Sequence, residues 1–290
     1  MITQLADVAA QVKSFWSPLF VPQLLENSRL PALVNRQYEG QIGAEGDKVK
    51  VSQIVRPTAQ RRQTGVDDTS VFTTQKLQTQ QVEVVANQVI SAGYEFESLV
   101  QLQSQIQSQD STIRQGLVES MIIELNNYLY SLAAAPTTST SGVTDFNAAQ
   151  LIALNVKAGQ NKWPDMDPWY LLADPVYHGD LLASQTLTDG DYVDDRPVVA
   201  GKMMQKKFNF NILQDNSAGM SALSPTAATT DLALAFHPDF LYLVMQLQPE
   251  FELSSLHSNR QFGFVLSAKM ILGAKVGLEG AAKHIRIYNS

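Results

Sequence analysis

The residues best suited to metal binding or acid–base catalysis are four histidines, which lie far apart in the sequence: His178, His237, His257 and His284. No HExxH motif is present, so no single helix offers a zinc ion two histidines with a glutamate between them. Folding can bring distant histidines together, but isolated ones are more often ordinary loop or partly buried residues. The sequence therefore predicts neither a catalytic nor a metal-binding histidine.

Four aspartates in one turn-rich segment form a second candidate site: Asp189, Asp191, Asp194 and Asp195. Their carboxylate oxygens could hold Ca²⁺, because calcium is bound by clustered oxygen ligands. However, the spacing does not fit an EF-hand loop, and no bidentate glutamate follows at the required place. An exposed acidic loop is the favoured interpretation.

Nucleophiles and phosphate-binding loops are not recognisable either. The chain has no cysteine and no GxSxG motif, which excludes disulfides, thiolate metal ligands and the common serine elbow. The glycines at 273–280 do not match GxGxxG, and Gly201–Lys202 lacks the preceding glycine of a phosphate loop. Four aromatic residues are expected to pack in a core rather than enclose a ligand: Trp163, Trp169, Tyr170 and Tyr177. We therefore expect no enzyme, no cofactor and no metal.

Composition favours contact with proteins over contact with nucleic acid. The 290 residues carry a net charge of −7 and only 17% charged residues, against about a quarter in typical soluble proteins. Interface cores are depleted in charge, although an ordinary low-charge protein would have the same composition. An acidic chain is not expected to bind nucleic acid through a basic face. No signal peptide or membrane span is recognisable, so we expect synthesis in the cytosol.

Two segments are difficult to bury within one domain. Pro18, Pro22 and Pro31 prevent a long helix near the N-terminus, where large apolar residues are concentrated. Such a segment is expected to lie on its own domain or to strap onto a neighbour. Next, polar and apolar residues alternate over 48–55, a polar turn-rich stretch covers 56–69, and a second extended run covers 70–89. These patterns predict a protruding hairpin that rests on something else, because an isolated hairpin is only marginally stable.

The rest of the chain is predicted to be mixed. After Gly93 the pattern becomes helical, and apolar residues spaced by three and four predict a long helix over Asp110–Ala133. Helices are expected at 145–159 and 174–183, and strands at 169–173 and 206–213. The segments 232–236, 241–247, 250–256, 262–277 and 283–287 are expected to be closing strands or short helices. The predicted class is α+β.

Taken in order, these segments resemble the major capsid proteins of tailed bacteriophages, which have the Hong Kong ninety-seven type of capsid fold. NRQYEG at 35–40 and GDKVKV at 46–51 are similar to the start of that family's extended loop. The helix at 110–133 corresponds to its spine helix, and ADPVY at 173–177 to a helix start in its axial domain. FNFNI at 208–212, AFHP at 235–238 and the segment 261–287 are similar to later strands.

The resemblance implies an N-terminal arm at 1–40, an extended loop at 41–92 and a peripheral domain with the spine helix at 93–145. It also implies an axial domain at 146–232 and closing strands of the peripheral domain at 233–290. Many copies would form the hexamers and pentamers of an icosahedral shell around double-stranded DNA in the virion, without sequence-specific DNA binding or a membrane. A portal and a possible cement or decoration protein are implied partners. Because arm-like residues begin almost at Met1, a separate scaffolding protein is expected.

In such a shell, the arm and the loop would contact neighbouring subunits. The expected apolar contacts are Phe15, Trp16 and Phe20. Four cations of the loop, Arg56, Arg61, Arg62 and Lys76, are expected to meet carboxylates of an adjacent subunit, with four candidates: Glu119, Glu124, Glu250 and Glu252. A solvated hairpin tip is the alternative, since many surface ion pairs contribute little.

Some relatives form lysine–asparagine cross-links. Here Lys76 is the only lysine of the loop beyond its first strand, and Asn259 is the nearest candidate asparagine, so a non-covalent shell is expected. Two other functions stay open. An encapsulin-type compartment would share the fold but carry an enzyme cargo, and a hydrolase or binding protein would have a site that forms only on folding.

Overall fold

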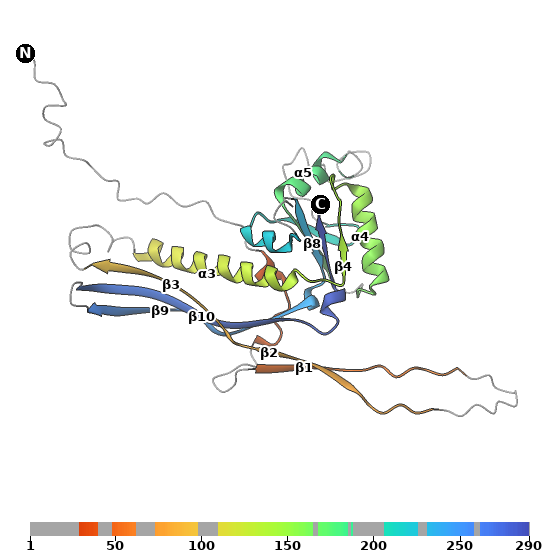
Figure 1. Cartoon of the computed structure of the whole chain (residues 1–290), viewed down its shortest axis with the longest axis horizontal. Helices are drawn as coiled ribbons and strands as arrows, with labels where there is room; N and C mark the ends of the chain where they lie inside the picture. The colour runs from red at the N-terminus through yellow and green to blue at the C-terminus, as the bar shows by residue number, and fades with distance from the viewer. Residues whose placement is uncertain are drawn as a thin grey trace, which may run out of the picture.

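The computed structural model describes residues 29–39, 48–61, 73–97, 110–164, 168–184, 187, 206–225, 231–257 and 262–289. The molecule is elongated (Figure 1): a long helix lies along a narrow sheet, a rounder unit with a second sheet adjoins one end of it, and a hairpin projects from the junction. This arrangement places three distinct surfaces at different ends of the subunit.

The narrow sheet contains β3 (Gln88–Glu97), β10 (Phe262–Val276) and β9 (Leu241–His257), all antiparallel and in that order. Helix α3 (Asp110–Ala133) covers one face. Leu117, Met121, Leu125 and Leu129 recur every four residues, which puts them on one side of the helix, in the same buried cluster as alternate residues of β10. The opposite face is mixed: Glu250 and Lys269 are exposed on it, whereas Val244 is buried in a separate cluster.

The rounder unit contains six strands in the order β4 (Thr138–Thr140), β11 (His284–Tyr288), β8 (Leu232–Phe236), β5 (Trp169–Ala173), β7 (Phe210–Gln214) and β6 (Lys206–Lys207). Strand β8 is buried throughout: Leu232, Leu234 and Phe236 join the α3 core, whereas Ala233 and Ala235 join a second core. Helices α4 (Ala148–Gln160) and α5 (Pro175–Ala183) contribute to this second core. The sheet therefore lies between two cores and connects the two units.

Local capping explains where the helices of this unit begin. The side chain of Asn147 accepts hydrogen bonds from Ala149 N and Gln150 N, so α4 begins at Ala148, three residues after its predicted start. The side chain of Asp174 accepts from Tyr177 N at 2.8 Å, and Pro175 occupies the first helical turn, as predicted. Short 3₁₀ turns η4 (Ala218–Leu223), η5 (Pro238–Phe240) and η6 (Gly280–Ala282) connect the remaining strands, and α1 (Leu30–Leu33) packs on α3.

Several predicted elements are confirmed, among them β1 (Lys48–Ile54), α3 and β5. The expected change to helix after Gly93 is wrong. Strand β3 runs through Gly93, which pairs with Ser267, and crosses the expected boundary at residue 92. A Cβ on Gly93 would lie 3.3 Å from the carbonyl oxygen of Leu266, so the glycine allows close packing rather than ending the strand.

Two further predictions differ from the structure. The strand expected at 206–213 is a hairpin, β6–β7, because Phe208 and Asn209 have positive φ angles and reverse the chain. The closing strands divide between the two sheets: β9 and β10 join β3, whereas β8 and β11 pair beside β5. Alternating apolar residues predict a strand but do not specify its partner.

Candidate functional site

The described histidines are separate, buried structural residues. His178 lies in α5 and His284 begins β11, and burial lowers the pKa of both imidazoles. His284 also packs on Phe240, with ring centroids 5.0 Å apart. Within the described residues, no three histidine or carboxylate side chains form a group suited to a metal ion. The side chain of His257 and the aspartates at 189–195 lie outside the described residues.

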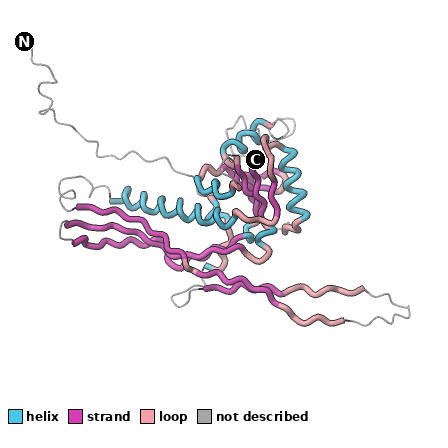
Figure 2. The backbone as a smooth tube through the Cα atoms, viewed as in Figure 1, coloured by secondary structure: helices cyan, strands magenta, loops and turns pink. Residues whose placement is uncertain are grey.

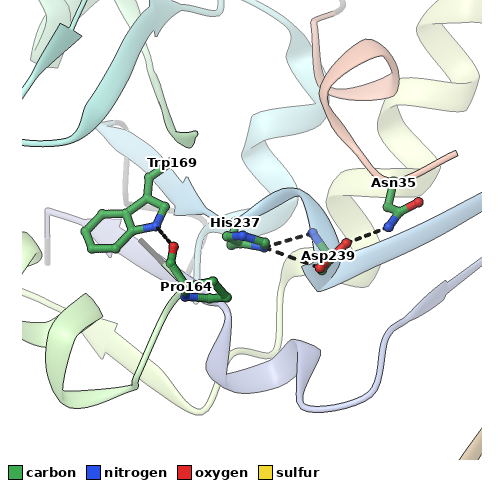
Figure 3. A network of polar contacts seen from close by, with 5 residues as sticks. All are labelled: Asn35, Pro164, Trp169, His237 and Asp239. Atoms are coloured by element: carbon green, nitrogen blue, oxygen red, sulfur yellow. Dashed lines mark hydrogen bonds and ion pairs between the residues drawn. The ribbon is translucent and has the colours of Figure 1, made fainter. Parts of the chain in front are cut away.

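The aromatic residues that could have formed a ligand site pack in cores, as predicted. Trp163 and Trp169 meet edge to face at 5.5 Å, and both are buried in the second core with Tyr177. The indole of Trp169 donates to the Pro164 carbonyl oxygen at 2.8 Å (Figure 3), and that of Trp163 donates to the Ala282 carbonyl oxygen. Tyr170 points to the other face of β5 and stacks on Phe236.

Buried acidic groups hold elements together. Burial raises the pKa of Asp174 to about 6, although its carboxylate accepts hydrogen bonds from Tyr177 N and Leu232 N. Asp215 accepts a 2.7 Å hydrogen bond from the Tyr130 hydroxyl and thereby links β7 to α3. Burial, followed by the charge of Asp215, raises the pKa of Tyr130. The Asp174–Leu232 contact joins the start of α5 to β8, and the Tyr130–Asp215 contact joins α3 to the end of β7.

The most distinctive surface of the molecule is the hairpin of β1 and β2 (Thr79–Val85). Its base is fixed: Val49, Val51 and Val84 form a buried cluster with Tyr242 and Val244 of β9. Glu83 lies 3.0 Å from Lys50 and 3.9 Å from Lys48, and the Lys50 hydrogen bond is the main cause of the lowered pKa of Glu83. The prediction that the hairpin rests on something else is thus confirmed for its base.

Beyond the strands, the two legs of the hairpin separate and project away from the body (Figure 2). Val55 N donates to the Gln78 carbonyl oxygen, after which glutamine side chains bridge the legs: Thr58 N donates to Gln75 Oε1 and Thr73 N to Gln60 Oε1. A groove of about 550 Å³ lies between the legs at residues 54–57 and 75–78. It includes Ile54 and Leu77, which are 59% and 77% exposed, so apolar area here is unburied in the single subunit.

Among the residues that the structure describes, the predicted loop cations and carboxylates do not meet within one subunit. Arg56, Arg61 and Lys76 are exposed, and no ion pair within the described residues involves them. Among the candidate carboxylates, Glu119 accepts from Gln115, Glu124 from Asn127, and Glu252 lies 3.6 Å from Lys269. Glu250 is exposed on β9, whose C-terminal end points away from the hairpin (Figure 1). Arg62, Phe15, Trp16 and Phe20 lie outside the described residues.

The sequence interpretation missed the anchor that fixes the first described segment. The amide of Asn35 donates to the Asp239 carboxylate (Figure 3), its backbone carbonyl accepts from Leu243 N, and Asn35 bridges to Tyr242. Tyr38 then packs edge to face on Tyr242, with ring centroids 5.3 Å apart. The sequence motif at 35–40 could have indicated this anchor, but the motif was interpreted as the start of the extended loop. Leu30 and Val34, just N-terminal to Asn35, are buried in the α3 core, so the whole described segment 29–39 is held against the body.

No helix in the described part of the chain is long and apolar enough to cross a membrane. No protein-family model and no curated protein matches the chain. Solved structures match along nearly its whole length. A structure of Mycobacterium phage Che8 matches with a TM-score of 0.74 at 18% identity, covering 95% of this chain and 96% of that chain.

Two capsids match comparably. The capsid of cyanophage Pam1 matches with a TM-score of 0.74 at 11% identity and 97% coverage of both chains. The capsid of cyanophage P-SCSP1u matches with a TM-score of 0.70 at 12% identity, covering 98% of this chain and 94% of that one. The chain therefore has the fold of these phage capsid proteins, and the predicted mixed α+β class and capsid fold are confirmed.

Proposed function

We propose that this chain is the major capsid protein of a tailed bacteriophage, which self-assembles into the hexamers and pentamers of an icosahedral shell around double-stranded DNA. The observation that carries the proposal is the match of nearly the whole chain to capsid proteins, with both chains covered almost completely. On this proposal the chain has a structural role in the virion and no catalytic one.

The distribution of surface groups supports assembly. Exposed cations and apolar residues lie on the hairpin, while β9 carries exposed Glu250 and Glu252 and ends far from it. Complementary surfaces at different ends of one subunit meet in a heterologous, head-to-tail contact, which generates rings or larger assemblies. The hairpin of one subunit would then bury its apolar groove on the next, and each contact can be weak because closure couples many of them.

The same proposal includes partners that supplement self-assembly. A separate scaffolding protein would guide closure, a portal would occupy one vertex, and a cement or decoration protein could bind the low-charge surface. The negative net charge suits an inner wall along which DNA packs without specific binding.

Electron microscopy of the purified full-length chain, at rising protein concentration, tests the proposal. We expect hexamers, pentamers or closed shells, and we expect particles from infected cells to contain nuclease-resistant DNA. Capsomers alone would still support the proposal, because scaffolding guides closure. Dispersed monomers at every concentration would contradict it, and particles filled with a protein cargo instead of DNA would favour an encapsulin-type compartment.

A further inference from the structure

Helix α4 has an exposed face without any charge. Its buried side consists of Ala148, Leu151, Leu154 and Ala158. Its exposed side carries Ala149, Ile152, Ala153 and Val156, and Ile152 and Val156 are 49% and 55% exposed. The side of a surface helix opposite its core face normally carries polar or charged side chains. The exposed side of α4 therefore lacks a partner in the described part of this subunit.

The single charged residue of α4 is directed away from that face. Lys157 Nζ donates to Thr140 Oγ1 at 2.6 Å, and Asn161 Nδ2 donates to Thr138 Oγ1 at 3.2 Å. Both bonds tie α4 to β4, which is an edge strand of the six-stranded sheet. Helix α4, which carries the apolar face, thus lies near the β4 edge of the sheet.

At the other edge of the same sheet, an aromatic residue occupies an unfavourable turn position. Lys207 pairs with Phe210, so Phe208 and Asn209 form a two-residue hairpin turn with φ angles of 47° and 69°. Such turns favour asparagine and glycine, and a bulky residue with positive φ is an outlier. The Phe208 ring is 39% exposed, so burial within this subunit does not offset the backbone cost.

Charge makes the two edges complementary. Lys206 and Lys207 form the edge strand β6, and neither has a charged partner in the described part of the chain. Asp145, just before α4, is exposed and likewise has no charged partner among those residues. Lysines on an edge strand oppose extension of the sheet by strand pairing, so contact at β6 must be made by side chains.

We infer that the Phe208 turn of one subunit packs on the exposed apolar face of α4 in a second copy, with Lys206 and Lys207 facing its Asp145. Because the two surfaces differ and lie at opposite edges of one sheet, the contact is heterologous and can close a ring of subunits. The inference rests on the proposed function, since it requires many copies, but it specifies one contact that the shell proposal does not.

Cysteine cross-linking tests this contact directly, because the natural chain has no cysteine. Subunits with Phe208→Cys are mixed with subunits carrying Val156→Cys, assembled, oxidised and run on a non-reducing denaturing gel. We expect a band at twice the 31.9 kDa subunit mass in the mixture, and mainly monomer from either variant alone. In the matched control, subunits with Phe208→Cys are mixed with subunits carrying Val176→Cys in α5. Val176 is 53% exposed, and we expect no cross-link in this mixture.

A second variant separates assembly from folding. Phe208→Gly relieves the unfavourable turn, so the unfolding midpoint of the free subunit should stay constant or rise. The same variant should raise the protein concentration needed for assembly by roughly tenfold or more, the loss expected for one buried aromatic contact. If Phe208 only stabilised the fold of its own subunit, Phe208→Gly would not stabilise the free subunit while impairing assembly.

The outcomes separate this inference from the shell proposal. Closed shells without the Phe208–Val156 cross-link, or with an equal cross-link in the Val176 control, would overturn the contact and leave the shell proposal standing. The cross-link in oligomers that form neither hexamers, pentamers nor shells would support the contact and weaken the shell proposal. Unchanged assembly of Phe208→Gly would overturn the contact.

Discussion

Gly273 of β10 lies directly against the carbonyl oxygen of Val85, where β2 ends: a Cβ at position 273 would be 2.1 Å from that oxygen. The two strands can approach this closely only because Gly273 has no side chain. This approach, with the cluster of Val49, Val51 and Val84 on β9, fixes the base of the hairpin to the body.

Gly273→Ala should therefore displace the base of the hairpin. We expect the free energy of unfolding of the unassembled subunit to fall by about 1–3 kcal/mol, as for other overpacked sites. Urea unfolding measures this. Gly179→Ala is the matched control, because a Cβ there meets nothing within 4 Å and alanine favours the helix by about 0.5–1 kcal/mol. Equal losses in both variants would contradict the account of the hairpin base.

Charge reversal on the hairpin should impair assembly without unfolding the subunit. In the double variant Arg61→Glu and Arg62→Glu, we expect an unchanged unfolding midpoint and a lower particle yield, because the cations would no longer face carboxylates of the next subunit. Lys162→Glu with Lys283→Glu changes the net charge equally and is the control, because neither lysine has an ion pair among the described residues. A normal particle yield from the hairpin variant would show that its tip is merely solvated.

Deletion of residues 1–25 tests the arm. It removes Phe15, Trp16, Leu19 and Phe20, and the first described residues after it are anchored through Asn35. We expect soluble subunits or capsomers that form less stable shells. Light scattering during heating or denaturant titration measures shell disruption. If truncated and full-length shells break at the same temperature and denaturant concentration, the arm does not strap subunits together.

The shell should hold without covalent links between subunits. Lys76 is exposed on the hairpin, but Asn259, the nearest candidate asparagine, is a poor partner because no glutamate adjoins it in sequence. Mature particles that are boiled and run on a denaturing gel should give one band at 31.9 kDa. A ladder of multimers that Lys76→Arg abolishes would establish an isopeptide bond at Lys76 and refute this prediction.

Asp174 should make the stability of the subunit depend on pH. Burial raises the pKa of this carboxyl from 3.8 to about 6, so the folded chain binds the proton more tightly than the unfolded chain. Its contribution to stability is then complete below pH 3.8 and is lost as the pH rises through about 6. Relative to Asp174→Asn, the free energy of unfolding of the natural chain should fall between pH 4 and pH 7 by an amount on the order of 2 kcal/mol. Parallel pH profiles for the two proteins would contradict this.

Patterns in the sequence predicted the elements whose formation depends on residues that are close together in the chain. The four-residue recurrence of apolar residues defined α3, alternation defined β1, and Asp174–Pro175 marked the start of α5. Pairing between strands was not predictable in this way. Residues of β8 read as one apolar run, and nothing in that run indicates that its neighbours are β5 and β11 rather than β9.

The surfaces that matter for assembly were predicted in part. The cations of the hairpin were recognisable because basic residues are few in an acidic chain. The exposed side of α4 was not, because the helix reads as a core element until the structure shows that only one side is covered. The turn at Phe208 was hidden by an alternation that continues across it, since a two-residue hairpin preserves the period of the strands.

In the proposed shell, each hairpin lies on a neighbouring subunit. Cryo-electron microscopy of the native particle would show this contact. We expect an icosahedral shell whose repeating unit has this fold, with the legs at 55–61 and 73–78 in contact with an adjacent copy. A particle without this chain in its shell, or a shell in which every hairpin projects freely into solvent, would contradict it.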